Sequence, residues 1–153
     1  MTWWTAHAEH TVSEDVPAPP DVVRDFFVDL DSLKVVHPLI VSVTELSRVD
    51  RADGYRQRYE VVDRLQWGRL GFRITYRVQW DVPVHGDVES EAVQSPGVRI
   101  RDTVSFAPVE GGTRVTERLR IQAPRPLARY TAREAVTAHV AMLAAIRAHF
   151  AAA

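Results

Sequence analysis

Apolar and polar residues alternate along most of this 153-residue chain, at the two-residue period of a β-strand. The clearest run lies between residues 69 and 80, where every second side chain is large and apolar: Leu70, Phe72, Ile74, Tyr76, Val78 and Trp80. Such a run is hard to produce as a helix, whose apolar face returns about every 3.6 residues. Similar runs cover residues 4–16, 39–48, 55–61, 87–94, 98–106 and 113–121. The pattern predicts about seven strands, joined by turns where Pro, Gly and Asp gather.

The period changes to that of a helix at the end of the chain, over residues 126–150. At about 100° per residue, one stripe of side chains falls within roughly a third of a turn: Val136, His139, Val140, Leu143, Ile146 and Phe150. The opposite face carries Thr137 and the alanines at positions 141, 144, 145 and 148. A helix of about 25 residues is about 37 Å long, so it needs a large curved surface to lie on. Two short helices are predicted earlier, over residues 21–30 and then up to residue 36, after a proline-rich turn.

The composition is that of one globular domain spanning residues 1–153, with 46% hydrophobic and 25% charged residues. The net charge of −1 gives no electrostatic reason to expect nucleic acid or an anionic membrane as a partner. The chain has no cysteine, which excludes disulfides and thiolate chemistry. No apolar segment approaches the roughly 18 residues of a membrane span, and the N-terminus does not have the pattern of a signal peptide. We therefore expect a soluble, cytoplasmic protein without integral membrane association.

The predicted element order is a strand, two small helices, six antiparallel strands and a long helix. A Val-x-Ala-Pro turn, Val16-Pro17-Ala18-Pro19, leads into a helix that ends at Asp29, and His37-Pro38 follows. Order and motif together resemble the SRPBCC superfamily of helix-grip proteins, which joins START lipid-transfer domains, pollen-allergen-type proteins and bacterial polyketide cyclase/dehydratase-like proteins. The resemblance covers essentially the whole chain. It implies an α+β fold in which a curved sheet wraps the long helix and encloses an apolar ligand, with no metal and no nucleotide cofactor.

Two carboxylates lie in the apolar phase of neighbouring strands, where they would face the cavity. Asp102 shares its phase with Val98, Ile100, Val104 and Phe106, and Glu117 shares its phase with Val115, Leu119 and Ile121. Centring the hairpin on residues 108–112 places the two carboxylates roughly opposite each other, within about 5 Å between Cβ atoms. Such a pair cannot ionise freely, so one member would have a raised pKa, as in a general acid/base pair. The alternatives are a register offset, a bulge that turns one carboxylate outward, or ion pairs with Arg99, Arg118 or Arg120.

Three histidines are candidate site residues. His139 lies in the middle of the apolar stripe, where it is either a third acid/base group or a hydrogen-bonded core residue. His10, in the inward phase of the first strand, leaves the same two interpretations open, and His37 either ends a short helix or lies at the cavity mouth. None of the histidines forms a helical pair with an acid nearby, so we expect no metal site.

The predicted ligand-binding residues are aromatic and aliphatic side chains of the inward faces, a set that suits a pocket for an oxygenated apolar molecule: Tyr59, Trp67, Phe72, Tyr76, Trp80, Phe106, His139, Leu143 and Ile146. Trp67 is either an exposed aromatic at the cavity entrance or a core residue.

Three functions remain open from the sequence. The first is a monomeric or homodimeric protein that binds a small hydrophobic or amphipathic molecule, such as a lipid, a sterol or a polyketide-like compound. The second is a cofactor-free cyclase, aromatase or dehydratase that uses Asp102, Glu117, His139 or a tyrosine for proton transfer. The third is a protein-interaction domain, which predicts a filled interior and an exposed apolar patch.

Overall fold

A computed structural model describes residues 2–152 of the chain. Within these residues one sheet of seven antiparallel strands has the order β1-β7-β6-β5-β4-β3-β2, so that β1 and β2 are its edges. The helices are a short 3-10 turn η1 (Thr2–Trp4), α1 (Pro20–Phe27), α2 (Leu30–Val36) and α3 (Arg125–Ala151). The strands are β1 (Thr5–Val16), β2 (Ile40–Arg51), β3 (Gly54–Trp67), β4 (Leu70–Pro83), β5 (Val88–Gln94), β6 (Val98–Val109) and β7 (Gly112–Pro124). The α+β helix-grip prediction is confirmed.

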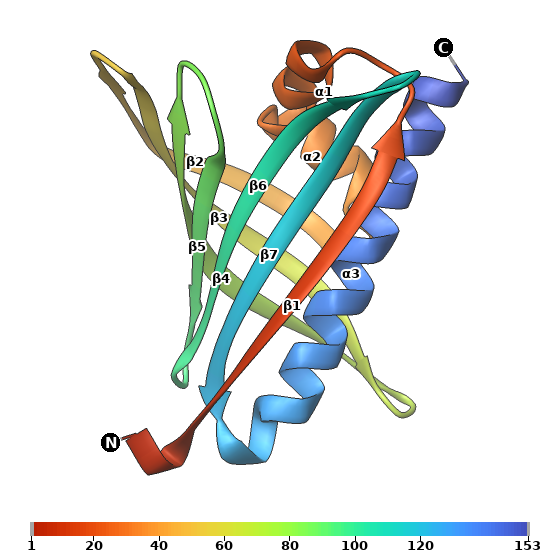
Figure 1. The fold of residues 1–153 in the computed structure, drawn as a ribbon. Coiled ribbons are helices and arrows are strands. Elements are labelled where there is room, and N and C mark those ends of the chain that lie inside the picture. Colours follow the sequence, from red (N-terminus) through yellow and green to blue (C-terminus); the bar gives the residue numbers. More distant parts are fainter. Residues whose placement is uncertain (1, 153) are drawn as a thin grey trace.

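The sheet is strongly curved, and α3 lies along its open side while α1 and α2 cover one end (Figure 1). Helix α3 packs mainly against β1 and β7, the two strands next to it at that edge. The strand phases are as predicted: along β3, for example, Gln57, Tyr59 and Val61 are buried while Arg58 is exposed. No helix in residues 2–152 combines the length and the apolar character needed to cross a bilayer.

The stripe that α3 presents to the sheet is rotated from the predicted one. Leu143 and Ile146 are buried as expected, but Val140 is 50% exposed, and Ala138 and Met142 are buried instead. The prediction for Val140 was wrong because the predicted stripe left out Ala138 and Met142, which lie on the other side of Leu143 and Ile146. Small alanines let a helix approach a sheet closely, and a flexible methionine fills the remaining irregular space.

The interior is divided into a packed end and a hollow end. At the packed end, the C-terminal half of α3 meets α1 and the sheet, and Phe27 lies against Phe106 with ring centroids 5.6 Å apart. Toward the N-terminal half of α3, the residues that face the sheet include Thr131, Ala135 and Ala138. These side chains are too short to fill the concave face of the sheet. A cavity remains there.

Candidate functional site

The cavity has a volume of about 310 Å³ and lies between α2, the N-terminal half of α3 and the concave face of the sheet. Most of its wall is apolar, and aromatic side chains from β3 and β4 form much of it. This size and lining are typical of sites for small molecules. The cavity also argues against the interaction-domain alternative, which predicts a filled interior.

The structure divides the predicted ligand-binding residues into two groups. Six of them line the cavity: Tyr59, Trp67, Phe72, Tyr76, Trp80 and His139. The other three, Phe106, Leu143 and Ile146, lie in the packed core at the α1 end and do not line the cavity. All three face the interior, but at this end of the molecule the side chains of α1, α3 and the sheet pack against one another and leave no cavity. Phase alone could not separate a core position from a cavity position.

The mouth of the cavity is next to the β3–β4 hairpin. Trp67, at the end of β3, is 55% exposed and stacks on Tyr130 of α3 with ring centroids 4.8 Å apart. The hydroxyl of Tyr130 donates a hydrogen bond of 3.1 Å to the carbonyl of Gln66. Trp67 is therefore an exposed aromatic at the edge of the cavity, which agrees with the first of its two predicted roles.

Asp102 and Glu117 face the same space although they are not cross-strand partners. Asp102 pairs with Leu119, and Glu117 pairs with Val104, so the two carboxylates are diagonal neighbours. The predicted register was wrong by two residues, and an offset of two keeps both side chains on one face of the sheet. Both are buried, at 5% and 0% exposure respectively. Among the described residues neither carboxylate has an ion pair with an arginine; Arg118 and Arg120 are exposed on the other face, and Arg99 is 3.7 Å from Glu91.

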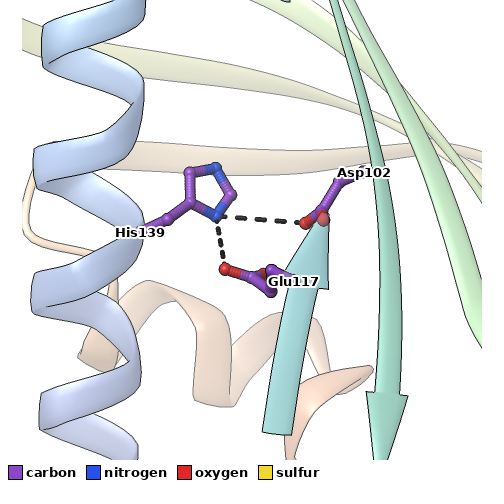
Figure 2. A group of neighbouring side chains, drawn as sticks. All are labelled: Asp102, Glu117 and His139. Atoms are coloured by element: carbon purple, nitrogen blue, oxygen red, sulfur yellow. Dashed lines mark hydrogen bonds and ion pairs between the residues drawn. The ribbon is translucent and has the colours of Figure 1, made fainter. Parts of the chain in front are cut away.

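His139 joins these two carboxylates from the opposite wall (Figure 2). Its Nδ1 atom is 2.9 Å from Oε2 of Glu117 and 3.9 Å from Oδ2 of Asp102. The imidazole thus forms a hydrogen bond with Glu117 and lies near Asp102, and 19% of its side chain remains exposed. Strands β6 and β7 supply the acids and α3 supplies the histidine, so the cluster exists only because α3 crosses these strands.

Burial and charge set the protonation of this cluster. Burial raises the pKa of Asp102 well above its usual range, and the nearby charge of Glu117 raises it further. Burial lowers the pKa of His139, but the carboxylate of Glu117 more than offsets this, so that the net pKa is raised. The arrangement therefore favours a neutral Asp102 and a protonated His139. The two groups lie side by side at the cavity wall, and Glu117 contacts His139 in the same cluster.

Each acid of this cluster has one oxygen atom that nothing in the described part of the chain satisfies. Oδ1 of Asp102 and Oε1 of Glu117 are buried and have no hydrogen-bond partner among the described residues. A buried acceptor without a partner costs about 1–3 kcal/mol, so such atoms are uncommon in structural ion pairs. Both expose almost no surface, so a molecule in the cavity reaches them only when these side chains turn.

Asp63 is a third buried acid that the sequence analysis missed. It is 5% exposed, it lines the cavity, and its Oδ1 atom also has no hydrogen-bond partner among the described residues. Burial raises its pKa from 3.8 to about 6, although the neighbouring Tyr76 hydroxyl partly opposes the shift. The signal was present in the sequence: Asp63 continues the inward phase of Gln57, Tyr59 and Val61 by one step.

The other two candidate histidines, His37 and His10, lie outside the cluster. His37 ends α2 and lines the cavity, with its ring centroid 6.1 Å from that of His139. Burial lowers the pKa of His37 to about 4, and the charge of His139 lowers it in the same direction. His37 therefore stays neutral. His10 shares the inward phase of β1 but is exposed, so it is not a core residue.

The three clustered groups are the ones whose positions could hold a metal ion within residues 2–152. Their nearest ligand atoms lie within 4.8 Å of one another. Two carboxylates and one imidazole are an acceptable donor set for a divalent cation. The direct hydrogen bond between Glu117 and His139 already joins these groups without an ion, and the expectation of no metal and no cofactor stays a prediction.

Comparison with known proteins gives a family match over most of the chain. A family model described as "Polyketide cyclase / dehydrase and lipid transport" matches residues 7–151. No curated protein sequence gives a significant match. The solved structure of TTHA0849 from Thermus thermophilus has 21% identity and a TM-score of 0.71, over 95% of this chain and 98% of that one.

Two further solved structures with a similar fold are an aromatase/cyclase and a lipid transfer protein. The Zhui aromatase/cyclase from Streptomyces sp. R1128 has 16% identity and a TM-score of 0.70, covering 95% of this chain and 93% of that one. A STAR-related lipid transfer protein from Xanthomonas axonopodis has 18% identity and a TM-score of 0.62, covering 93% and 85%. At these identities the similarity shows a shared fold and leaves the activity open.

Proposed function

The chain belongs to the polyketide cyclase / dehydrase and lipid transport family, and on that premise we propose that it binds a small hydrophobic or amphipathic molecule in the cavity beneath α3. The observation that carries the proposal is the cavity itself, about 310 Å³ in volume with a mainly apolar wall. Leaving apolar side chains unpacked costs stability, because the contacts across the space are lost. A protein that keeps such a space gains from filling it with a ligand.

A pair of alanine substitutions on α3 tests this proposal. Ala138 faces the cavity and is 5% exposed, whereas Ala141, one turn away, is exposed on the outer face. Ala138→Phe places a ring in the cavity, so we expect it to weaken binding of an uncharged fluorescent dye such as N-phenyl-1-naphthylamine by about tenfold or more. Ala141→Phe adds the same ring to the outside and should leave the affinity unchanged. Equal binding by both variants would place the dye elsewhere and contradict the proposal.

Acid/base catalysis is a second candidate function, which the Asp102–Glu117–His139 cluster favours. We infer that, if a carbonyl compound enters the cavity, Glu117 takes a proton from the carbon next to one carbonyl group. The enolate then attacks a second carbonyl of the same molecule, and neutral Asp102 donates a proton to the oxygen that becomes the hydroxyl. Loss of water from this product completes an aldol condensation. Both acids line the cavity next to His139, which supports these roles.

Asp102→Asn separates catalysis from binding. Heptane-2,6-dione is a suitable test substrate, because its intramolecular condensation gives 3-methylcyclohex-2-enone and water, and the enone absorbs in the ultraviolet. If the cluster is catalytic, the wild-type protein accelerates this reaction and Asp102→Asn loses about 100-fold or more of the rate, with dye affinity within a few fold. Asp53→Asn, in the exposed β2–β3 turn, is the control. Equal rates for Asp102→Asn and the wild type would exclude the catalytic role of Asp102.

A further inference from the structure

The ionisable groups of the cavity wall are strongly biased toward acids. Among the described residues the wall contains four carboxyl groups, those of Asp63, Asp102, Glu117 and Glu134, and no lysine or arginine. The arginines of β4 and β7, which are numerous, lie on the other face of the sheet, where Arg77 and Arg114 form ion pairs. The cavity wall is therefore suited to an apolar molecule, but it offers no lysine or arginine to pair with an anionic group of that molecule.

The one cationic group at the wall is already neutralised. His139 forms its hydrogen bond with Glu117 at 2.9 Å, and Asp102 is 3.9 Å from the same nitrogen. The other histidine of the wall, His37, stays neutral because burial lowers its pKa to about 4. A ligand carboxylate would thus lose its hydration next to Asp63 and Glu117 without gaining a free cation. Burying an uncompensated charge in this way costs several kcal/mol.

A ligand group that donates hydrogen bonds finds acceptors in the cavity wall. Three buried carboxyl oxygens in the wall have no partner among the described residues: Oδ1 of Asp63, Oδ1 of Asp102 and Oε1 of Glu117. They come from β3, β6 and β7, and their carboxyl groups line the cavity although these oxygens themselves expose almost no surface. If the side chains turn toward a ligand, an ammonium or hydroxyl group can donate to these atoms and remove the cost of leaving them unpaired.

We propose that the cavity selects apolar molecules whose polar group donates hydrogen bonds, namely a protonated amine or a hydroxyl group, and rejects molecules of the same shape that carry a carboxylate. This inference rests on the proposed binding function and defines the chemical class of its ligand. It excludes free fatty acids as the favoured cargo. It also means that an anionic dye is a poor reporter of this cavity.

Three naphthalene compounds that differ only in their polar group test the proposal: 2-(naphthalen-2-yl)ethylamine, 2-(naphthalen-2-yl)ethanol and naphthalen-2-ylacetic acid. Each displaces N-phenyl-1-naphthylamine, which is uncharged, at about pH 7.5, where the amine is protonated and the acid is ionised. We expect the amine to bind at least about tenfold more tightly than the acid. An acid that binds within about threefold of the amine, or more tightly, overturns the proposal.

The alcohol identifies which interaction selects the ligand. An affinity close to that of the amine assigns the selection to hydrogen-bond donation, and an affinity close to that of the acid assigns it to attraction between charges. The first outcome supports the proposal, and the second overturns it for hydroxyl groups.

Two variants locate the selectivity in the cavity wall. Asp63→Asn removes one charge and one acceptor, so we expect it to lower the amine-to-acid affinity ratio severalfold. Glu117→Gln serves as a second variant and should lower the ratio in the same direction. Asp53→Asn makes the same chemical change as Asp63→Asn at an exposed turn and should leave the ratio unchanged. A ratio that is unchanged in both cavity variants overturns the assignment.

The uncharged dye keeps the failure of this proposal distinct from that of the binding function. If the dye does not bind the wild-type protein, or binds equally to Ala138→Phe, the cavity is not a binding site and the proposed function fails. If the dye binds in the cavity but the acid competes as well as the amine, only the inference about ligand class fails.

Discussion

Asp63 lies in surroundings that its residue type does not favour. A carboxyl group is normally solvated, yet this one is 5% exposed and one of its oxygens has no partner among residues 2–152. Such a group lowers the stability of the fold when it is ionised, because burial disfavours the charge. Residues that reduce stability in this way are concentrated at functional sites. Like Asp102, Glu117 and His139, Asp63 is therefore a candidate functional group of the cavity wall.

The pH dependence of stability should reveal the burial of Asp63. The pKa of this group is raised from 3.8 in the unfolded chain to about 6 in the fold. Its neutral form is thus favoured by folding, and the folded state loses stability as the pH rises between these two values. A shift of this size corresponds to about 3 kcal/mol. Asp63→Asn removes the titration, so its free energy of unfolding, relative to wild type, should increase by about 2–3 kcal/mol between pH 4 and pH 7.

Urea denaturation of both proteins at several pH values measures this difference. Asp53→Asn, at an exposed position, should follow the wild-type curve. If the difference between Asp63→Asn and wild type does not change with pH, the carboxyl group is solvated in the folded protein.

At the scale of elements, the junction between β1 and β7 is one of the places where two strands meet very closely. Gly112 begins β7 beside the end of β1, and a Cβ atom there would lie 2.0 Å from the carbonyl oxygen of Val16. That distance is far below van der Waals contact. The two strands can meet this closely only because residue 112 has no side chain. The glycine thereby places Thr113, whose hydroxyl donates a 2.7 Å hydrogen bond to the carbonyl of Ala18, beneath the turn into α1.

Gly112→Ala should therefore be strongly destabilising. We expect a loss of about 2 kcal/mol or more in the free energy of unfolding, because β1 must move away from β7. Gly71→Ala is the control: Gly71 also lies in a strand, but a Cβ atom there would be 3.3 Å from the flexible end of Gln66, and the expected change is within about 0.5 kcal/mol. Denaturant titration of the two variants makes the comparison. Equal effects would mean that β1 and β7 can separate without cost.

At the scale of the whole molecule, the β3–β4 hairpin and α3 meet at the cavity mouth. The stacking of Trp67 on Tyr130 and the hydrogen bond from Tyr130 to Gln66 join them. These contacts are exposed and few, so they can open without disrupting the core at the other end. We expect a ligand that leaves on this side of the cavity to break them.

Tyr130→Phe removes the hydrogen bond and keeps the ring. Because a hydrogen bond of this kind contributes about 1 kcal/mol, we expect the dye to dissociate about two- to fivefold faster, with little change in the melting temperature. Stopped-flow displacement of N-phenyl-1-naphthylamine measures the rate. Tyr55→Phe makes the same change at a residue that does not line this cavity and should leave the rate unaltered. Identical rates for Tyr130→Phe and wild type would exclude this contact as a barrier to release.

The sequence by itself determined the elements and their inward faces. Alternation in β4 and the helical period of α3 are local properties, since each follows from the spacing of side chains along one segment. The phases of Asp102 and Glu117 were correct for the same reason. The order of elements and the Val-x-Ala-Pro turn then pointed to the helix-grip fold, which the family model and the solved structures confirm.

Only the tertiary structure decided which inward residues meet. The register between β6 and β7 set Asp102 and Glu117 as diagonal neighbours, and the rotation of α3 brought His139 to them while turning Val140 outward. The division of the interior into a packed end with Phe106 and a hollow end with Tyr59 and Tyr76 also depends on how far α3 stands from the sheet. These properties are non-local: each is fixed by contacts between segments far apart in the chain, and no single segment carries them.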